Sequence, residues 1–170
     1  MRNLVLIGMR GAGKSTVGRI IAAKINYQFL DTDDLIWQAT QMTIKNIIDN
    51  YGWDHFRKLE SEVVEQVSMN KKTIISTGGG VVINPTNVEN LKKNGRIIFL
   101  FANPETLANR SENSQSTDSR PALTDQPTLL KELETIWLER EHHYRQAADH
   151  IIDVNDLTPL EVAEKILEAY

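Results

Sequence analysis

The stretch NLVLIGMRGAGKST, residues 3–16, decides the fold. It begins with an apolar run, residues 3–7, which is typical of a strand buried on both faces. The pattern G-x-x-x-x-G-K-[ST] follows and uses Gly8, Gly13, Lys14 and Ser15. In such a P-loop, backbone N–H groups bind phosphates, the lysine reaches the β- and γ-phosphates, and the hydroxyl binds Mg²⁺. The sequence therefore predicts a strand, a phosphate-binding loop and a helix in direct succession.

This stretch does not fit two other nucleotide-binding patterns. The dinucleotide pattern G-x-G-x-x-G fails, because Thr16 stands where the third glycine after Gly11 and Gly13 would be. A GTPase would carry a guanine-reading Asn-Lys-x-Asp segment, and the chain has none. We therefore expect ATP as the nucleotide.

Apolar runs and helical stretches alternate along the rest of the chain. Short runs rich in β-branched or aromatic residues lie at 3–7, 28–30, 73–76, 96–101 and 150–154. Amphipathic stretches of helical length lie at 14–26, 33–70 in two or three pieces, 86–93, 104–111, 127–148 and 159–169. This alternation predicts an α/β protein with a parallel sheet covered by helices.

Composition limits the possible classes of protein. A chain of 170 residues is most simply one domain, residues 1–170, and zero cysteines exclude disulfides and cysteine-ligated metals. The net charge of -4 argues against nucleic acid as a partner. The apolar run before Gly8 is too short for a secretory signal, and no run approaches the roughly 20 apolar residues of a membrane span. We expect a cytoplasmic protein, a monomer, with no membrane partner.

Three carboxylates crowd the segment FLDTDDLI, residues 29–36. Asp31 and Asp33 follow the second predicted strand, so they should emerge at the edge of the sheet that holds the P-loop. One of them can serve Mg²⁺, and the other can accept a hydrogen bond from an incoming hydroxyl. Asp34 is explained by the dipole of the following helix. The alternative for the whole cluster is helix capping.

Two arginines lie in or beside apolar helix faces. Arg140 lies in the middle of a stripe formed by Leu129, Leu133, Ile136, Tyr144 and Ala147. Arg57 flanks a stripe formed by Trp53, Phe56, Leu59, Val63 and Val67. A buried guanidinium must be paired, because an unpaired buried charge is very costly. Each arginine is explained either by an internal salt bridge, for which Glu60 is available to Arg57, or by a bidentate clamp on a substrate carboxylate.

Two further segments interrupt the alternation. The segment TGGGVV places three consecutive glycines directly after a predicted strand. Such a triplet is expected where the backbone adopts positive φ or approaches another group closely. The segment SENSQSTDS, residues 111–119, has no apolar residue, and its composition predicts a solvated surface loop.

The chain resembles the shikimate kinases over essentially its full length. The resemblance rests on six motifs in the order of the family: GMRGAGKST (8–16), FLDTDDLI (29–36), FRKLE (56–60), STGGGVV (76–82), SRPAL (119–123) and REHHYRQAA (140–148). It implies the nucleoside monophosphate kinase-like P-loop fold, with three α/β/α layers and a five-stranded parallel sheet in the order 2-3-1-4-5. It also implies transfer of the ATP γ-phosphate to the 3-hydroxyl of shikimate, a step of chorismate and aromatic amino acid biosynthesis.

The resemblance also implies roles for single residues. Asp31 resembles the aspartate on the magnesium side, next to Ser15, and Asp33 resembles the one that binds the substrate hydroxyls. Arg57 and Arg140 resemble the carboxylate clamp, within a substrate-binding segment of about residues 32–61 and beside the glycines Gly78, Gly79 and Gly80. The implied catalytic residues are Lys14, Asp33 and Arg120.

On the nucleotide side, the resemblance implies ATP contacts from Gly11, Ala12, Gly13, Lys14, Ser15, Thr16, Arg110, Arg120 and Pro159. Arg120 resembles the arginine of a mobile lid, about residues 111–125, which closes over the phosphates and excludes water. The interval from Arg110 to Arg120 is longer than is usual in the family. Leu157 stands where many members place an arginine against adenine, so Pro159 and the backbone are expected to hold the base.

Two alternatives remain open. The first is another small-molecule P-loop kinase, such as a gluconate or nucleotide kinase, because gluconate is also a carboxylated polyol. The second is a catalytically silent relative that binds a nucleotide or a protein partner. Loss of Lys14, Asp33 or Arg120 would be its signature, and all three are present.

Overall fold

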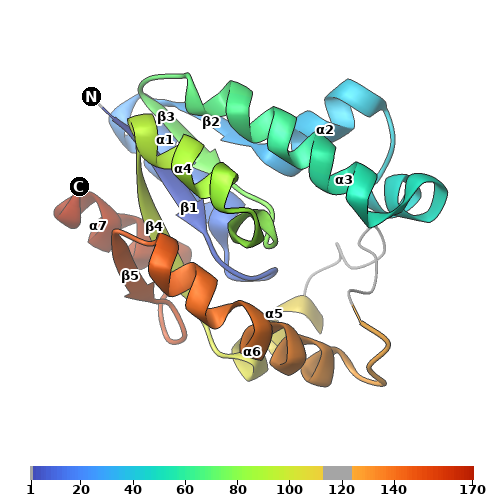
Figure 1. Cartoon of the computed structure of the whole chain (residues 1–170). Coiled ribbons are helices and arrows are strands. Elements are labelled where there is room, and N and C mark those ends of the chain that lie inside the picture. The colour runs from blue at the N-terminus through green and yellow to red at the C-terminus, as the bar shows by residue number, and fades with distance from the viewer. Residues whose placement is uncertain (1, 113–123) are drawn as a thin grey trace.

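The computed structural model describes residues 2–112 and 124–170. Their five strands form one parallel sheet in the order β2-β3-β1-β4-β5, as predicted (Figure 1). The strands are β1 (Asn3–Ile7), β2 (Gln28–Asp31), β3 (Thr73–Ser76), β4 (Gly95–Phe101) and β5 (His150–Asp153). The helices are α1 (Lys14–Ile25), α2 (Thr32–Thr40), α3 (Ile44–Ser68), the 3₁₀ turn η1 (Val81–Ile83), α4 (Pro85–Asn94), α5 (Pro104–Glu112), α6 (Leu129–Ala147) and α7 (Pro159–Ala169).

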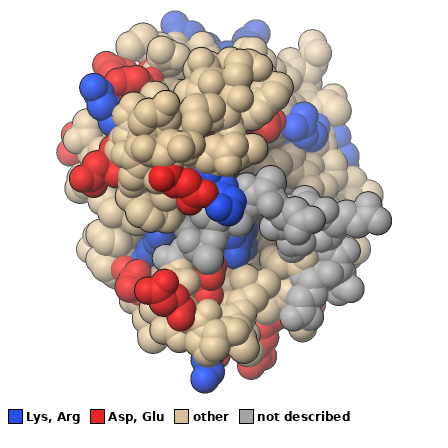
Figure 2. Space-filling view, turned by 90° about the vertical axis from the view of Figure 1, so that its right-hand side faces the viewer, with Lys and Arg blue, Asp and Glu red and all other residues tan. Residues whose placement is uncertain are grey.

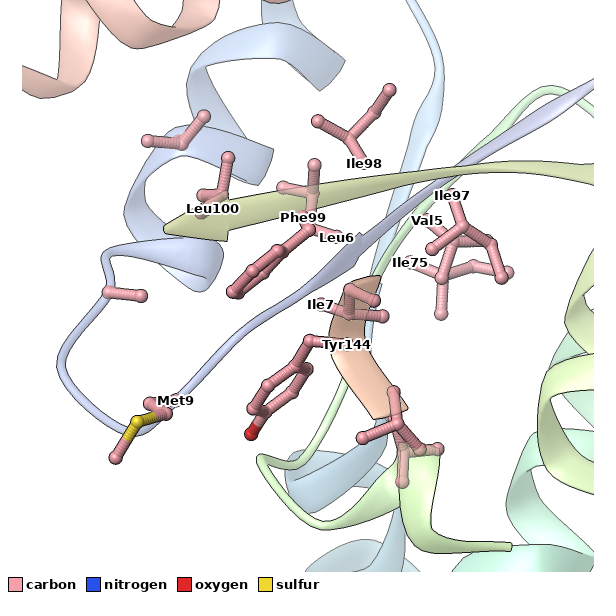
Figure 3. Packing of buried hydrophobic residues seen from close by; sticks show 14 of the residues in the cluster. Val5, Leu6, Ile7, Met9, Ile75, Ile97, Ile98, Phe99, Leu100 and Tyr144 are labelled. Atoms are coloured by element: carbon pink, nitrogen blue, oxygen red, sulfur yellow. The ribbon is translucent and has the colours of Figure 1, made fainter. Parts of the chain in front are cut away.

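The central strand β1 carries the core. Its apolar residues, Leu4 to Ile7, are completely buried, because β3 and β4 pair with it on either side and helices cover both faces. Helix α1 packs against α7 on one face, while α4 and α6 contact β4 and η1. Figure 3 shows Ile98 and Leu100 on one side of β4 and Phe99 on the other side, facing Tyr144 of α6. The layers are therefore α/β/α, which confirms the predicted architecture.

The predicted helical segment 33–70 divides into three pieces. Helix α2 ends at Thr40, and α3 contains a break at Gly52, whose φ of 84° and ψ of 170° lie outside helical values. The break separates the first turns of α3 from the longer part that carries Phe56, Arg57 and Glu60.

Local signals fix the start of α6. Thr128 is its N-cap, and the Thr128 hydroxyl accepts a hydrogen bond from the Lys131 N–H. The helix therefore begins at Leu129, two positions after Pro127.

The predicted lid falls mainly on residues 113–123, which lie outside the described part of the chain together with Arg120. Within residues 2–112 and 124–170, no helix has the length and apolarity needed to cross a membrane.

Candidate active site

A cavity of about 410 Å³ lies at the carboxyl ends of the strands. It brings together the P-loop, the end of β2, the second part of α3, the glycine triplet and one face of α6. Most predicted site residues line it: Gly11, Gly13, Lys14, Ser15, Thr16, Asp31, Asp33, Arg57, Gly78, Gly79, Gly80, Arg110 and Arg140. Figure 2 shows acidic and basic side chains interspersed on the face of the molecule turned toward the viewer.

The P-loop is shaped to receive an anion. Gly13 precedes α1 at a φ of 92°, a left-handed conformation that favours glycine. No side chain caps the start of α1 and no acidic residue lies in its first turn, so its N–H groups and its dipole are available to phosphate. The Lys14 ammonium is buried and donates hydrogen bonds to the carbonyls of Gly8 and Met9, at 2.8 and 2.9 Å.

An oxygen-rich cluster adjoins the P-loop. The Ser15 hydroxyl donates to Asp31 Oδ2 at 2.6 Å and lies 3.2 Å from the Ser76 hydroxyl. The other carboxylate oxygen of Asp31 accepts the Asp33 N–H at 3.0 Å and thereby caps α2. Asp31 therefore combines the capping role with a place beside Ser15. Sequence reasoning missed Ser76, although its position at the end of β3, next to β1, would have been a usable signal.

This cluster fits Mg²⁺. Its donors are all oxygens, and Mg²⁺ usually takes one or two protein oxygens, several waters and substrate phosphates. Among the described residues, no group of three His, Asp or Glu side chains could hold a metal by itself. Ser15 and Asp31 are therefore suited to a metal that arrives with a nucleotide.

Asp33 and Asp34 lie in different surroundings. Asp33 faces the glycine triplet: a Cβ added at Gly78 would lie 2.9 Å from Asp33 Oδ1 and 3.0 Å from Glu60 Oε2. Asp34 is largely exposed and pairs with Arg19 at 3.4 Å. Partial burial and the nearby Asp31 raise the pKa of Asp34, and Arg19 opposes this shift. Asp34 therefore lies in the first turn of α2, at the exposed edge of the cavity.

The buried carboxylate of Glu60 pairs with Arg57 and is also influenced by the charge of Arg140. Arg57 Nη1 donates to Glu60 Oε1 at 2.7 Å, and the Arg57 guanidinium packs on the rings of Trp53 and Phe56. Burial raises the pKa of Glu60, although Arg57 and Arg140 oppose the shift. The predicted internal salt bridge of Arg57 is thus present, and Arg57 still lines the cavity.

Arg140 and Glu60 each retain a buried atom that makes no hydrogen bond within the described part of the chain. These atoms are Arg140 Nε and Glu60 Oε2. A buried donor of a charged group is costly to leave without an acceptor. Because Arg140 lines the cavity, an anionic ligand would supply that acceptor.

Of the residues predicted to contact ATP, not all line the cavity. Arg110 lines the cavity and donates to the Val154 carbonyl at 2.5 Å. Ala12 is buried in the core, and Pro159 begins α7; neither lines the cavity. Sequence reasoning also missed the ion pair between Arg10 and Glu132 at 3.1 Å, because no local pattern links the P-loop to α6.

The fold and the cavity define a small-molecule P-loop kinase. Residues 10–170 match the family model described as shikimate kinase. The chain belongs to the shikimate kinase family, and the family prediction is confirmed.

Individual relatives agree with this membership. The shikimate kinase of Caldanaerobacter subterraneus subsp. tengcongensis is 43% identical, over 100% of this chain and 96% of its own length. The structure of shikimate kinase from Acinetobacter baumannii in complex with shikimate matches with a TM-score of 0.92 and 31% identity, covering 99% of this chain and 92% of that one. A gluconokinase from Sinorhizobium meliloti 1021 matches with a TM-score of 0.62 and 18% identity over 98% of this chain and 90% of its own, which shows a shared fold alone.

Proposed function

We propose that the protein transfers the γ-phosphate of ATP to the 3-hydroxyl of shikimate, giving shikimate 3-phosphate and ADP. The observation that carries the proposal is Arg140 Nε, a buried donor without an acceptor in the described residues, in a cavity that also holds Arg57 and Asp33. These groups match a ligand with one carboxylate and neighbouring hydroxyls. Membership of the shikimate kinase family supports the same substrate.

Phosphoryl transfer depends mainly on positioning and charge neutralisation. Arg57 and Arg140 would hold the carboxylate, and Asp33 would accept a hydrogen bond from the attacking hydroxyl and orient it. Lys14 would exchange its bonds to the P-loop carbonyls for bonds to the β- and γ-phosphates. Whether Asp33 also removes the proton is a separate hypothesis, which near-normal turnover of Asp33→Asn with intact shikimate binding would refute.

Ser15 and Asp31 would hold Mg²⁺, directly or through water. When bound, the ion would supply positive charge that offsets the negative charge developing on the phosphates. Arg120 lies outside the described residues, and its closing role over the phosphates remains a prediction, as do the cytoplasmic location and the monomeric state.

The decisive experiment measures ADP release from ATP with shikimate, gluconate and nucleoside monophosphates offered separately. We expect turnover with shikimate and only background with the others, and Lys14→Ala should abolish it. Turnover confined to gluconate or a nucleotide would assign another kinase. Nucleotide binding without turnover on any acceptor would identify a silent relative.

A further inference from the structure

Tyr144 of α6 is a completely buried tyrosine behind the cavity wall. Its ring stacks on Phe99 of β4, with centroids 4.9 Å apart and planes inclined by 11° (Figure 3). The stacking fixes the ring plane, and therefore the direction in which the hydroxyl points. Burying a hydroxyl without a hydrogen bond is costly, so its partner matters.

The partner is the backbone of the glycine triplet. The Tyr144 hydroxyl donates to the Gly79 carbonyl at 2.5 Å, across 65 positions of sequence. Gly79 also lies against the P-loop, since a Cβ added there would lie 3.5 Å from the Arg10 nitrogen and 3.6 Å from the Gly8 carbonyl oxygen. The same Cβ would lie 3.7 Å from the Tyr144 hydroxyl. Gly79 therefore sits between the P-loop and Tyr144.

Fixing the Gly79 carbonyl also fixes the next N–H. The peptide between Gly79 and Gly80 is trans, so the Gly80 N–H points opposite to the Gly79 carbonyl and away from Tyr144. Gly80 lines the cavity and lies directly against the Arg57 guanidinium. Its N–H donates no hydrogen bond to any residue in the two described ranges.

Tyr144 remains a donor under ordinary conditions. Burial raises its pKa to about 12, even though the charge of Arg140, a side-chain hydrogen bond with Arg140 and the charge of Arg57 oppose the shift. Tyr144 also lies one helical turn after Arg140, on the same face of α6. One side chain thus links the glycine triplet to the helix that carries the buried arginine.

We propose that Tyr144 is a positioning residue for the acid-binding half of the site. Its hydroxyl orients the Gly79–Gly80 peptide so that the Gly80 N–H donates to the substrate beside Arg57 and Arg140. This inference rests on the proposed function, because it concerns the same acidic substrate. Tyr144 itself touches neither the substrate nor the phosphates.

The test is Tyr144→Phe, which keeps the stacked ring and removes only the hydroxyl. We expect the KM for shikimate to rise about tenfold, because a buried carbonyl loses its donor and the peptide is no longer held. The KM for ATP should stay within about twofold, because the P-loop keeps its own contacts. The matched control is Tyr170→Phe, whose hydroxyl also donates to a carbonyl, that of Arg2, at 2.5 Å but at the opposite end of β1.

Each variant loses one hydrogen bond from a tyrosine hydroxyl to a backbone carbonyl, so we expect a lower melting temperature for both, but only Tyr144→Phe should shift the KM for shikimate. An unchanged KM for shikimate in Tyr144→Phe, or an equal rise in both KM values, would overturn the inference. If Tyr144→Phe does not fold, Phe99→Leu keeps the hydroxyl but removes its stacking partner, and a selective rise in the shikimate KM is again required. Wild-type turnover with shikimate is measured first: its absence refutes the proposed function, whereas its presence with an unaffected Tyr144→Phe refutes this inference alone.

Discussion

At the scale of one residue, Glu60 shows how burial disfavours the charge of a carboxylate beside two arginines. The carboxylate is only 1% exposed and bonds to Arg57, yet its pKa is raised because burial outweighs the neighbouring arginines. The folded protein therefore holds a proton on Glu60 at a pH where the unfolded chain has released it. The organisation of the arginine pair comes at a cost in stability when Glu60 is ionised.

The pH dependence of stability tests this account of Glu60. From the ordinary value of 4.5 up to the raised pKa, the folded state binds more protons than the unfolded state. The contribution of Glu60 to the free energy of unfolding therefore falls as pH rises through this window. Glu60→Gln cannot titrate, so its free energy of unfolding should increase relative to wild type over the same window. Urea denaturation of both proteins at several pH values measures the difference, and a difference independent of pH would contradict the shift.

Gly80 leaves no room for a side chain, because the Arg57 guanidinium lies directly beside it. A Cβ at this position would come within 2.6 Å of Arg57 Cζ, so Gly80→Ala must displace the guanidinium. We expect the KM for shikimate to rise by about tenfold or more, with little change in the KM for ATP. Steady-state kinetics with each substrate varied in turn measures this effect.

Gly52→Ala is the contrasting variant for Gly80→Ala. A Cβ at Gly52 meets nothing within 4 Å, but its backbone, with φ 84° and ψ 170°, is strained for any other residue. We expect it to lower stability by about 1–3 kcal/mol and to leave both KM values nearly unchanged. A kinetic effect of Gly52→Ala as large as that of Gly80→Ala would show that strain, not displacement of Arg57, explains the result.

At the scale of elements, the start of α2 combines two functions in Asp31. One carboxylate oxygen caps the helix and the other accepts from Ser15. Asparagine caps helices as well as aspartate does, but it lacks the charge that favours Mg²⁺. Asp31→Asn should therefore keep the wild-type melting temperature while raising the Mg²⁺ concentration needed for half-maximal turnover.

Asp31→Ala should lose both functions, with about 1 kcal/mol of stability lost with the cap. Thermal melts and Mg²⁺ titrations of the two variants separate the roles. If Asp31→Asn required no additional Mg²⁺, Asp31 would be a helix cap only.

The elements themselves were largely predictable from the sequence. Strand runs such as 73–76 matched because consecutive β-branched residues are buried on both faces of the sheet. The strand order came from the resemblance to the family and is confirmed.

The unpredicted contacts share a physical cause. The bond from Tyr144 to Gly79 and the ion pair of Arg10 with Glu132 join segments far apart in sequence. Periodicity reports which face a residue occupies, and it does not report which atom on another element that face meets. The apolar stripe of α6 therefore predicted that Tyr144 is buried, but not that its hydroxyl holds a carbonyl.

At the scale of the whole molecule, the cavity collects charges from segments that are distant in sequence. Ligands that satisfy these charges should stabilise the folded state. With Mg·ATP and shikimate each at about 100 times its dissociation constant, we expect about 2.7 kcal/mol per ligand. For a chain of this length, that is a rise in melting temperature of about 5–10 °C per ligand. Thermal melts measure this rise in melting temperature. As a control, gluconate added to Mg·ATP should give no further rise. An equal rise with gluconate would show that the cavity does not discriminate between the two acids.

The order of strands in the sheet has a consequence for how the chain folds during synthesis. Strand β1 is made first, yet its neighbours are β3, where Ile75 lies opposite Val5, and β4, where Ile97 lies opposite the same residue. During synthesis, β1 therefore has no partner strand on either side until β3 and β4 have been made. The segment NLVLI is exposed to chaperones and to aggregation during that interval. The phosphate-binding loop also packs on β4, because a Cβ added at Gly8 would lie 2.7 Å from the Leu100 carbonyl oxygen, so its native surroundings are complete only when β4 is in the sheet.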